Sequence, residues 1–160
     1  MTEDVLETTL SEPLSEDERA ASYRSFWERM LHDPAGTPVH RQLQLKILQL
    51  RPRTVLSMEL SDDVRGVYPG SIHGGMLAAF ADAASATALW NSLDRRTSVP
   101  VTTDMHIRYY RQPRGGPLTA EVDVVHEGRR LLSTEGVIRD AQDRVLARTT
   151  GPFAIQPLRT

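Results

Sequence analysis

The sequence has no cysteine and a single lysine, Lys46, among its 160 residues. The lack of cysteine excludes a disulfide scaffold and thiolate chemistry, and it fits a reducing compartment. The other residues among the 19 lysines and arginines are all arginine. The net charge of -2 gives no indication of a nucleic-acid or anionic-membrane partner. The acidic N-terminus has no basic region before an apolar run, so we find no signal peptide and expect a cytoplasmic protein.

Several catalytic motifs are also missing. There is no Walker loop, no G-x-S-x-G elbow and no His-Glu-x-x-His pattern. We therefore expect no metal and no cofactor. Apart from His73, the histidines have no spacing typical of metal ligands; they are His32, His40, His106 and His126.

The chain is long enough for one domain with a real core. We expect an N-terminal extension over residues 1–38, with an acidic lead-in over residues 1–14. Ser15 and Glu18 fit a capping box for an amphipathic helix that ends before Pro34. Its apolar stripe is typical of core or interface packing and consists of Tyr23, Phe26, Trp27, Met30 and Leu31.

Residues 39–160 form the predicted main domain. From Val39 the hydrophobic period changes to two, with Leu43, Leu45 and Ile47 on one face of a strand. This pattern predicts an α+β fold, in which an antiparallel sheet packs on a long helix. The other expected strands span residues 54–60, 99–110, 118–126, 130–139 and 144–155.

The expected central helix runs from Gly70 to Trp90 and is rich in alanine, with one acid, Asp82, in its middle. A membrane span is the rival interpretation. Alanine gains little in a bilayer, and an Asp at the helix centre costs roughly 2.5–3.5 kcal/mol on the insertion scale. We therefore expect a helix surrounded by protein, with no membrane partner.

Two glycines, Gly74 and Gly75, stand in the first turn of this helix, where each costs about 1 kcal/mol relative to alanine. Bare N–H groups at a helix N-terminus form a ready oxyanion site. The alternative is that Gly70, Gly74 and Gly75 only turn the chain into the helix. For Asp82, the alternative to catalysis is a buried acid that caps backbone groups.

Gly74 and Asp82 are eight residues apart, or about 12 Å along a helix. One small reacting group needs contacts of about 3 Å from both. If both act on it, Asp82 of one chain meets Gly74 of another, and the site requires a dimer.

The run Gly70-Ser-Ile-His-Gly-Gly75, followed by Ala81-Asp82, resembles the hotdog-fold acyl-CoA thioesterases of the phenylacetate-pathway and 4-hydroxybenzoyl-CoA type. The likeness continues through residues 102–109 and residues 127–129 and covers roughly residues 40–156. It implies a hotdog fold and a homodimer whose sheets join edge to edge. The predicted N-terminal helix lies outside the likeness and is an extra element on that fold. Whether dimers pair into a homotetramer is left open.

The resemblance also implies a hydrolase that acts on an acyl-CoA or acyl-carrier thioester, with coenzyme A only as part of the substrate. Asp82 would be the nucleophile or the base that activates water, and the Gly74 amide would hold the thioester oxygen, with Gly75 beside it. Thr102 would orient the water or Asp82, unless it is an ordinary strand threonine. His73 would shape the turn by hydrogen bonds.

One departure concerns Val67, which stands where many members have an asparagine near the thioester. Loss of a polar contact there can cost about 10²-fold in rate. Tyr68, the next residue, lines an acyl pocket in one interpretation. Non-catalytic binding of acyl-CoA or an acyl carrier is thus the alternative function, while a hotdog dehydratase lacks its glycine- and proline-rich signature here. Candidate phosphate ligands, each alternatively a solvated strand-end charge, are Arg108, Arg111, Arg129 and Arg130.

Overall fold

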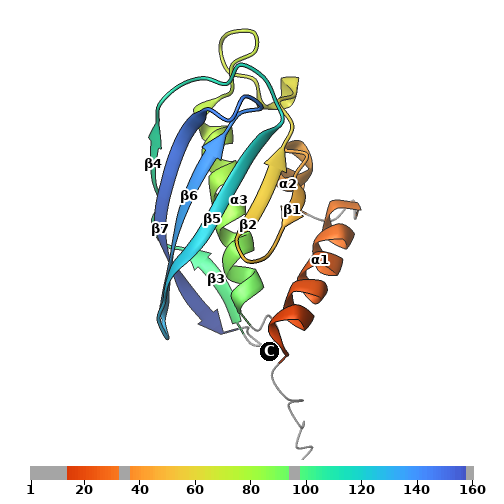
Figure 1. Cartoon of the computed structure of the whole chain (residues 1–160), viewed down its shortest axis with the longest axis vertical. Helices are drawn as coiled ribbons and strands as arrows, with labels where there is room; N and C mark the ends of the chain where they lie inside the picture. Colours follow the sequence, from red (N-terminus) through yellow and green to blue (C-terminus); the bar gives the residue numbers. More distant parts are fainter. Residues whose placement is uncertain (1–13, 33–36, 94–97, 158–160) are drawn as a thin grey trace, which may run out of the picture.

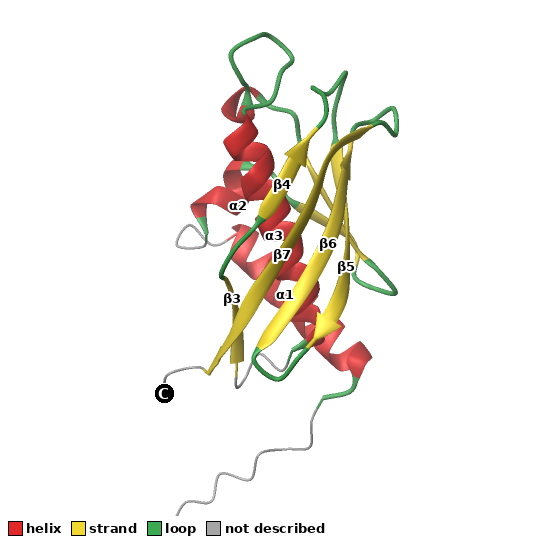
Figure 2. Ribbon diagram, turned by 90° about the vertical axis from the view of Figure 1, so that its left-hand side faces the viewer, coloured by secondary structure: helices red, strands yellow, loops and turns green. Residues whose placement is uncertain are grey.

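The computed structural model describes residues 14–32, 37–93 and 98–157. Within these ranges seven strands form one antiparallel sheet in the order β1-β2-β5-β6-β7-β3, and β4 also pairs with β7. Figures 1 and 2 show the sheet curling around α3. The strands are β1 (Lys46–Gln49), β2 (Thr54–Met58), β3 (Ser98–Thr102), β4 (His106–Tyr109), β5 (Leu118–Glu127), β6 (Leu131–Arg139) and β7 (Val145–Pro157).

The central helix α3 (Gly74–Ser92) is buried on most of its circumference, as its composition predicts. Leu77, Phe80 and Leu89 are its large core side chains, and small residues between them let the strands approach closely. A curled antiparallel sheet around a long helix is the hotdog fold, so the predicted fold class is confirmed. None of the helices in the described ranges has the length and hydropathy needed to cross a bilayer.

The N-terminal helix α1 (Glu16–His32) packs on α3 (Figure 1). The predicted capping box is present: the Ser15 N–H donates to Glu18 Oε2 at 2.8 Å, and the Glu18 N–H donates to Ser15 Oγ at 3.3 Å. Tyr23 and Trp27 are buried, which confirms a packing role for the stripe. Residues 1–13, the turn at 33–36, and the side chains of Met30 and Leu31 lie outside the described part.

The prediction of a strand from Val39 is wrong for its first residues, because β1 begins only at Lys46. Residues Pro38–Gln42 form a short helix, α2, with proline in its first turn, where its fixed φ favours a helix. Gln44 has a φ of 49°, a left-handed conformation that no strand allows. Leu43 and Leu45 are still buried, but from a tight turn, and pairing with β2 begins at Lys46.

The strand expected over residues 99–110 is interrupted. Its two halves, β3 and β4, pair with successive parts of β7, and the chain bulges between Thr102 and His106. A Cβ at Gly151 on β7 would lie 2.6 Å from the Asp104 carbonyl oxygen. The bulge therefore passes over β7 at a position that only glycine allows.

The expected β6–β7 hairpin is present, and Asp140 holds its loop. This carboxylate is 4% exposed and accepts hydrogen bonds from the N–H groups of Arg114, Gln142 and Arg144 and from the Arg144 guanidinium. Burial alone would raise the pKa of Asp140, but these donors outweigh it and lower the pKa from 3.8 to about 2.

We expect Asp140→Asn to lower the free energy of unfolding at pH 7 by about 3 kcal/mol, because an amide cannot accept from all of these donors. The folded pKa lies below the unfolded one, so the Asp140 contribution is complete above about pH 4 and is lost as pH falls toward 2. Urea denaturation between pH 7 and pH 2 measures both effects.

The control is Asp143→Asn, in the same loop but with a side chain 87% exposed. It should change stability by less than about 0.5 kcal/mol. The assignment fails if wild type and Asp140→Asn lose stability in parallel on acidification.

Candidate active site

The tip of α3 has a free backbone N–H group. His73 is the N-cap residue, and its Nδ1 accepts a hydrogen bond from the Gly75 N–H at 3.0 Å, the turn-shaping contact expected of it. The N–H groups of Met76 and Leu77 both donate to the His73 carbonyl. The Gly74 N–H has no acceptor among the described residues, so it is available to a ligand.

The fold itself does not need glycine at position 74. A Cβ there would meet only the Tyr109 ring, at 3.9 Å, which is an ordinary contact. Gly70, in contrast, has a φ of 73°, and a Cβ on Gly75 would lie 3.1 Å from the His73 Nδ1 atom. The loop-turning alternative therefore accounts for Gly70 and Gly75 but not for Gly74.

Side chains from β4 and the residues after it hold this tip. The Tyr109 hydroxyl donates to the Gly74 carbonyl at 3.0 Å, and Gln112 Oε1 accepts from the Ile72 N–H at 2.9 Å. Sequence reasoning missed both as site residues. The alternation of Ile107 and Tyr109 places them on one face of the strand, so Tyr109 had a signal, whereas Gln112 had none.

Asp82 lies half-buried near the middle of α3. The Thr102 hydroxyl, at the end of β3, donates to Asp82 Oδ1 at 2.7 Å. This contact joins two residues that the sequence placed in one site. Asp82 Oδ2 has no partner among the described side chains and backbone groups, which leaves it free for a ligand or water.

His40 is a neighbour of Asp82 that the sequence gave no reason to select. Its ring stacks on Trp27 with centroids 4.7 Å apart. Burial lowers the pKa of His40 below its usual value, although the charge of Asp82 acts in the opposite direction. The imidazole is thus neutral at pH 7. Across the described ranges no group of His, Asp or Glu side chains is placed to hold a metal ion.

Within one chain, Gly74 and Asp82 do not converge. They are the first and ninth residues of the regular helix α3, so the spacing of about 12 Å along its axis stands. The requirement for a second chain at the site stays a prediction.

Val67 and Tyr68 lie in the loop before α3 and are 87% and 73% exposed. Both line a cavity of about 280 Å³ beside Gly74. A second cavity, of about 290 Å³, also reaches Gly74 and is lined by Ile72, Leu77, Tyr109, Tyr110, Arg111 and Gln112. Gly74 thus lines both cavities.

The structure separates the candidate arginines. Arg108 is exposed on β4 and alternates with Tyr109, so it lies on the sheet face away from α3. Arg129 and Arg130 are exposed in the β5–β6 turn. The Arg130 carbonyl accepts a hydrogen bond from the N–H of Ile155 on β7, and Ile155 pairs with Pro100 of β3. These two arginines therefore lie toward the β3 end of the sheet edge, and Gly74 lies toward the β4 end.

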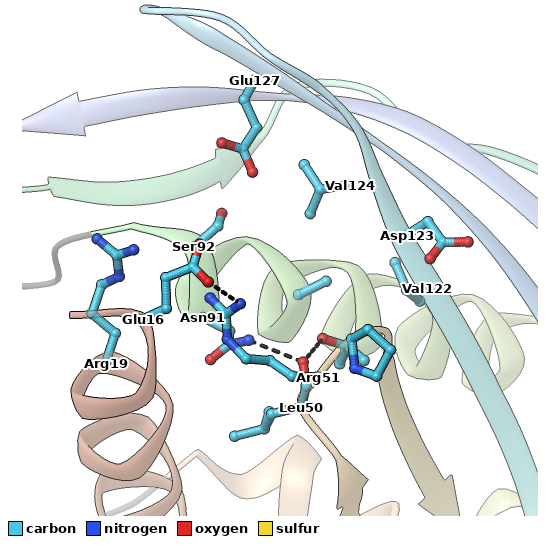
Figure 3. Close-up of a pocket in the computed structure, with 13 residues that line it drawn as sticks. Glu16, Arg19, Leu50, Arg51, Asn91, Ser92, Val122, Asp123, Val124 and Glu127 are labelled. Carbon is cyan, nitrogen blue, oxygen red and sulfur yellow. Dashed lines mark hydrogen bonds and ion pairs between the residues drawn. The ribbon is translucent and has the colours of Figure 1, made fainter.

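Another cavity, of about 260 Å³, lies at the far end of α3 (Figure 3). Its wall includes Asn91, whose amide donates to the Leu50 carbonyl at 3.0 Å, and the ion pair of Arg51 with Glu16 at 2.6 Å. None of the predicted site residues lines it.

The sequence profile of the thioesterase superfamily matches residues 69–147, which include the α3 tip, Asp82 and Thr102. The match places the α3 tip and the strands after it in the part of the chain that is similar to the thioesterase superfamily. The subtype expected from the resemblance stays a prediction.

Sequence relatives of the chain include candidate esterases of Deinococcus radiodurans, 29% identical over 59% of this chain, and Bacillus subtilis, 29% identical over 52%. These alignments span 58% and 68% of the relatives' own lengths.

Solved structures support the fold. A thioesterase of Haemophilus influenzae aligns over 93% of this chain and 95% of its own, with a TM-score of 0.74 and 15% identity. A Bacillus halodurans protein crystallised with CoA aligns over 94% and 99%, with a TM-score of 0.71 and 23% identity.

The two glycines should respond oppositely to alanine. Gly74→Ala should raise the free energy of unfolding by roughly 0.5–1 kcal/mol, because the site is helical and has room for a Cβ. Gly70→Ala should lower it by about 1–2 kcal/mol, because its φ is left-handed. Urea denaturation compares them, and equal destabilisation would give Gly74 a structural role.

Proposed function

We propose that this chain hydrolyses an acyl-CoA or acyl-carrier thioester: water adds to the carbonyl carbon, the carbon–sulfur bond breaks, and a carboxylic acid and a free thiol leave. The observation that carries the proposal is the free Gly74 N–H, at a helix tip where the fold does not require glycine. The match of residues 69–147 to the thioesterase superfamily supports the reaction class.

In this mechanism the Gly74 N–H binds the thioester oxygen as it becomes an oxyanion. The positive end of the helix dipole adds to this stabilisation, and removal of one such donor typically costs about 10²–10³-fold in kcat. His73 fixes the turn by capping Gly75, so the free N–H stays exposed.

Asp82 acts from a second chain, as the nucleophile or as the base that activates water. The Thr102 hydroxyl holds Oδ1, so Oδ2 is the oxygen that faces the reacting carbon or the water.

A homodimer follows from the spacing, and the sheet offers a way to form it. β3 is the last strand in the sheet order, and β3 and β4 both pair only with β7 among the described strands. Such an open edge presents unpaired N–H and C=O groups to another chain. Pairing two such edges about a two-fold axis brings each Asp82 toward the other chain's Gly74.

Coenzyme A is the thiol we propose, and exposed arginines are the candidate ligands of its phosphates: Arg108, Arg129 and Arg130. The Bacillus halodurans neighbour crystallised with CoA supports this choice. Tyr68 and Val67 border the cavity at Gly74 and would contact the acyl group.

Non-catalytic binding of an acyl thioester is the second candidate function. Val67 favours it, because an exposed valine stands where the resembled family has a polar contact to the thioester. The two functions differ in turnover.

We expect wild type to release free thiol from at least one member of an acyl-CoA panel, and Asp82→Asn to lower kcat by at least about 10²-fold. Asp63→Asn, an exposed carboxylate in the 3-10 helix η1 (Asp62–Val64), is the control and should keep full activity. Binding without turnover in wild type selects the second function, and an active Asp82→Asn removes Asp82 from the mechanism.

The shared site can be tested with a heterodimer purified through two different tags. One chain carries Asp82→Asn and the other Gly74→Pro, which deletes the N–H at a helix position where proline is tolerated. The His73 backbone, at φ -68° and ψ 131°, suits a following proline.

Each heterodimer has one intact pair of groups and should keep about half of the wild-type turnover per dimer, while both homodimers are inactive. If each site were built by a single chain, the heterodimer would be as inactive as its parents.

A further inference from the structure

Tyr109 contacts the proposed oxyanion donor from the edge strand. Its hydroxyl donates to the Gly74 carbonyl at 3.0 Å, and its ring lies 3.9 Å from the point where a Cβ of Gly74 would be. The side chain is 48% exposed, so burial of its own surface does not explain its position.

The tip needs such an anchor. Two consecutive glycines have more backbone freedom than any other pair of residues, and an oxyanion donor acts through being held in place before the reaction. The His73 Nδ1 atom accepts a hydrogen bond from the Gly75 N–H, and Gln112 Oε1 accepts one from the Ile72 N–H. Tyr109 is the side chain that holds Gly74 itself.

No other side chain near the tip is placed for this task. Val67 is apolar, and Gln112 Oε1 already accepts from Ile72. Tyr110, the next residue, lines the same cavity beside Gly74 and is therefore no control. Ser92 provides one, because its hydroxyl donates to the Leu89 carbonyl at 2.9 Å at the opposite end of α3.

We propose that Tyr109 is a positioning residue for the reaction: through its hydrogen bond to the Gly74 carbonyl and its ring against Gly74, it holds the first turn of α3, and with it the Gly74 N–H, in place against β4. This rests on the proposed function, because the N–H is useful only if a carbonyl oxygen meets it.

The first test compares Tyr109→Phe with Ser92→Ala in the full-length protein, using the acyl-CoA that wild type hydrolyses best. Tyr109→Phe keeps the ring and loses the hydrogen bond. We expect kcat to fall by about 10-fold or more with KM changed less than about 3-fold, because the Gly74 N–H stabilises the transition state more than the bound substrate. Ser92→Ala also removes a hydroxyl donor to a carbonyl of α3, and it should keep both constants within about 2-fold of wild type.

A second measurement does not depend on turnover. The sequence has 10 glycines, so selective ¹⁵N-glycine labelling gives a sparse amide spectrum. In Tyr109→Phe the order parameter of the Gly74 amide should fall from about 0.85 toward about 0.6. The Gly75 amide, held by His73, should stay rigid and serves as the internal control.

The outcomes separate the two proposals. Loss of order at Gly74 in a protein without thioesterase activity keeps Tyr109 as the anchor and rejects the hydrolytic function. An unchanged Gly74 amide, or a Tyr109→Phe variant with the same kcat as Ser92→Ala in an active enzyme, overturns the positioning role. A folded Tyr109→Phe with lower stability but wild-type kcat overturns it as well.

Discussion

The hydrogen bond between Thr102 and Asp82 is the contact on which the site depends. It joins the middle of the buried helix to the end of β3, the strand at the open edge of the sheet. A carboxylate in an otherwise apolar helix is poorly solvated, and a hydroxyl donor at 2.7 Å offsets part of that cost. The same bond occupies Oδ1 and leaves Oδ2 without a partner among the described residues. In the proposed mechanism, stability and chemistry therefore depend on one interaction.

Much of the fold could be predicted because the responsible signals are local. Alanine content and the absence of charge around Asp82 defined α3, and the capping box of Ser15 and Glu18 defined the start of α1. The errors arose where backbone geometry overrides a hydrophobic pattern. Leu43 and Leu45 alternate like strand residues, but Gln44 between them is left-handed. The interruption near Asp104 depends on the absence of a side chain at Gly151, which is distant in sequence.

The site shows the same division. Asp82 and Thr102 could be paired from sequence through the resemblance, and the glycines at the helix tip marked an unusual N-terminus. Tyr109, Gln112 and His40 were missed because each reaches the site through tertiary contacts. His40 illustrates the limit: it comes from a short helix that was expected to be a strand, and it is held by Trp27 of α1. The N-terminal extension thus contributes to the surroundings of Asp82 as well as covering α3.

In the proposed mechanism α3 carries both the Gly74 N–H and the Asp82 carboxylate, yet one copy of the helix does not complete a site. A straight helix keeps Gly74 and Asp82 at a fixed spacing that side-chain motion cannot close. An antiparallel copy of the helix reverses that spacing, so each tip lies opposite the other copy's carboxylate. The bulge over Gly151 matters here, because it divides the sheet edge into one part beside Asp82 and another beside Gly74. In the proposed dimer, an edge built in two parts can present Asp82 beside β3 and Gly74 beside β4 to the same partner chain.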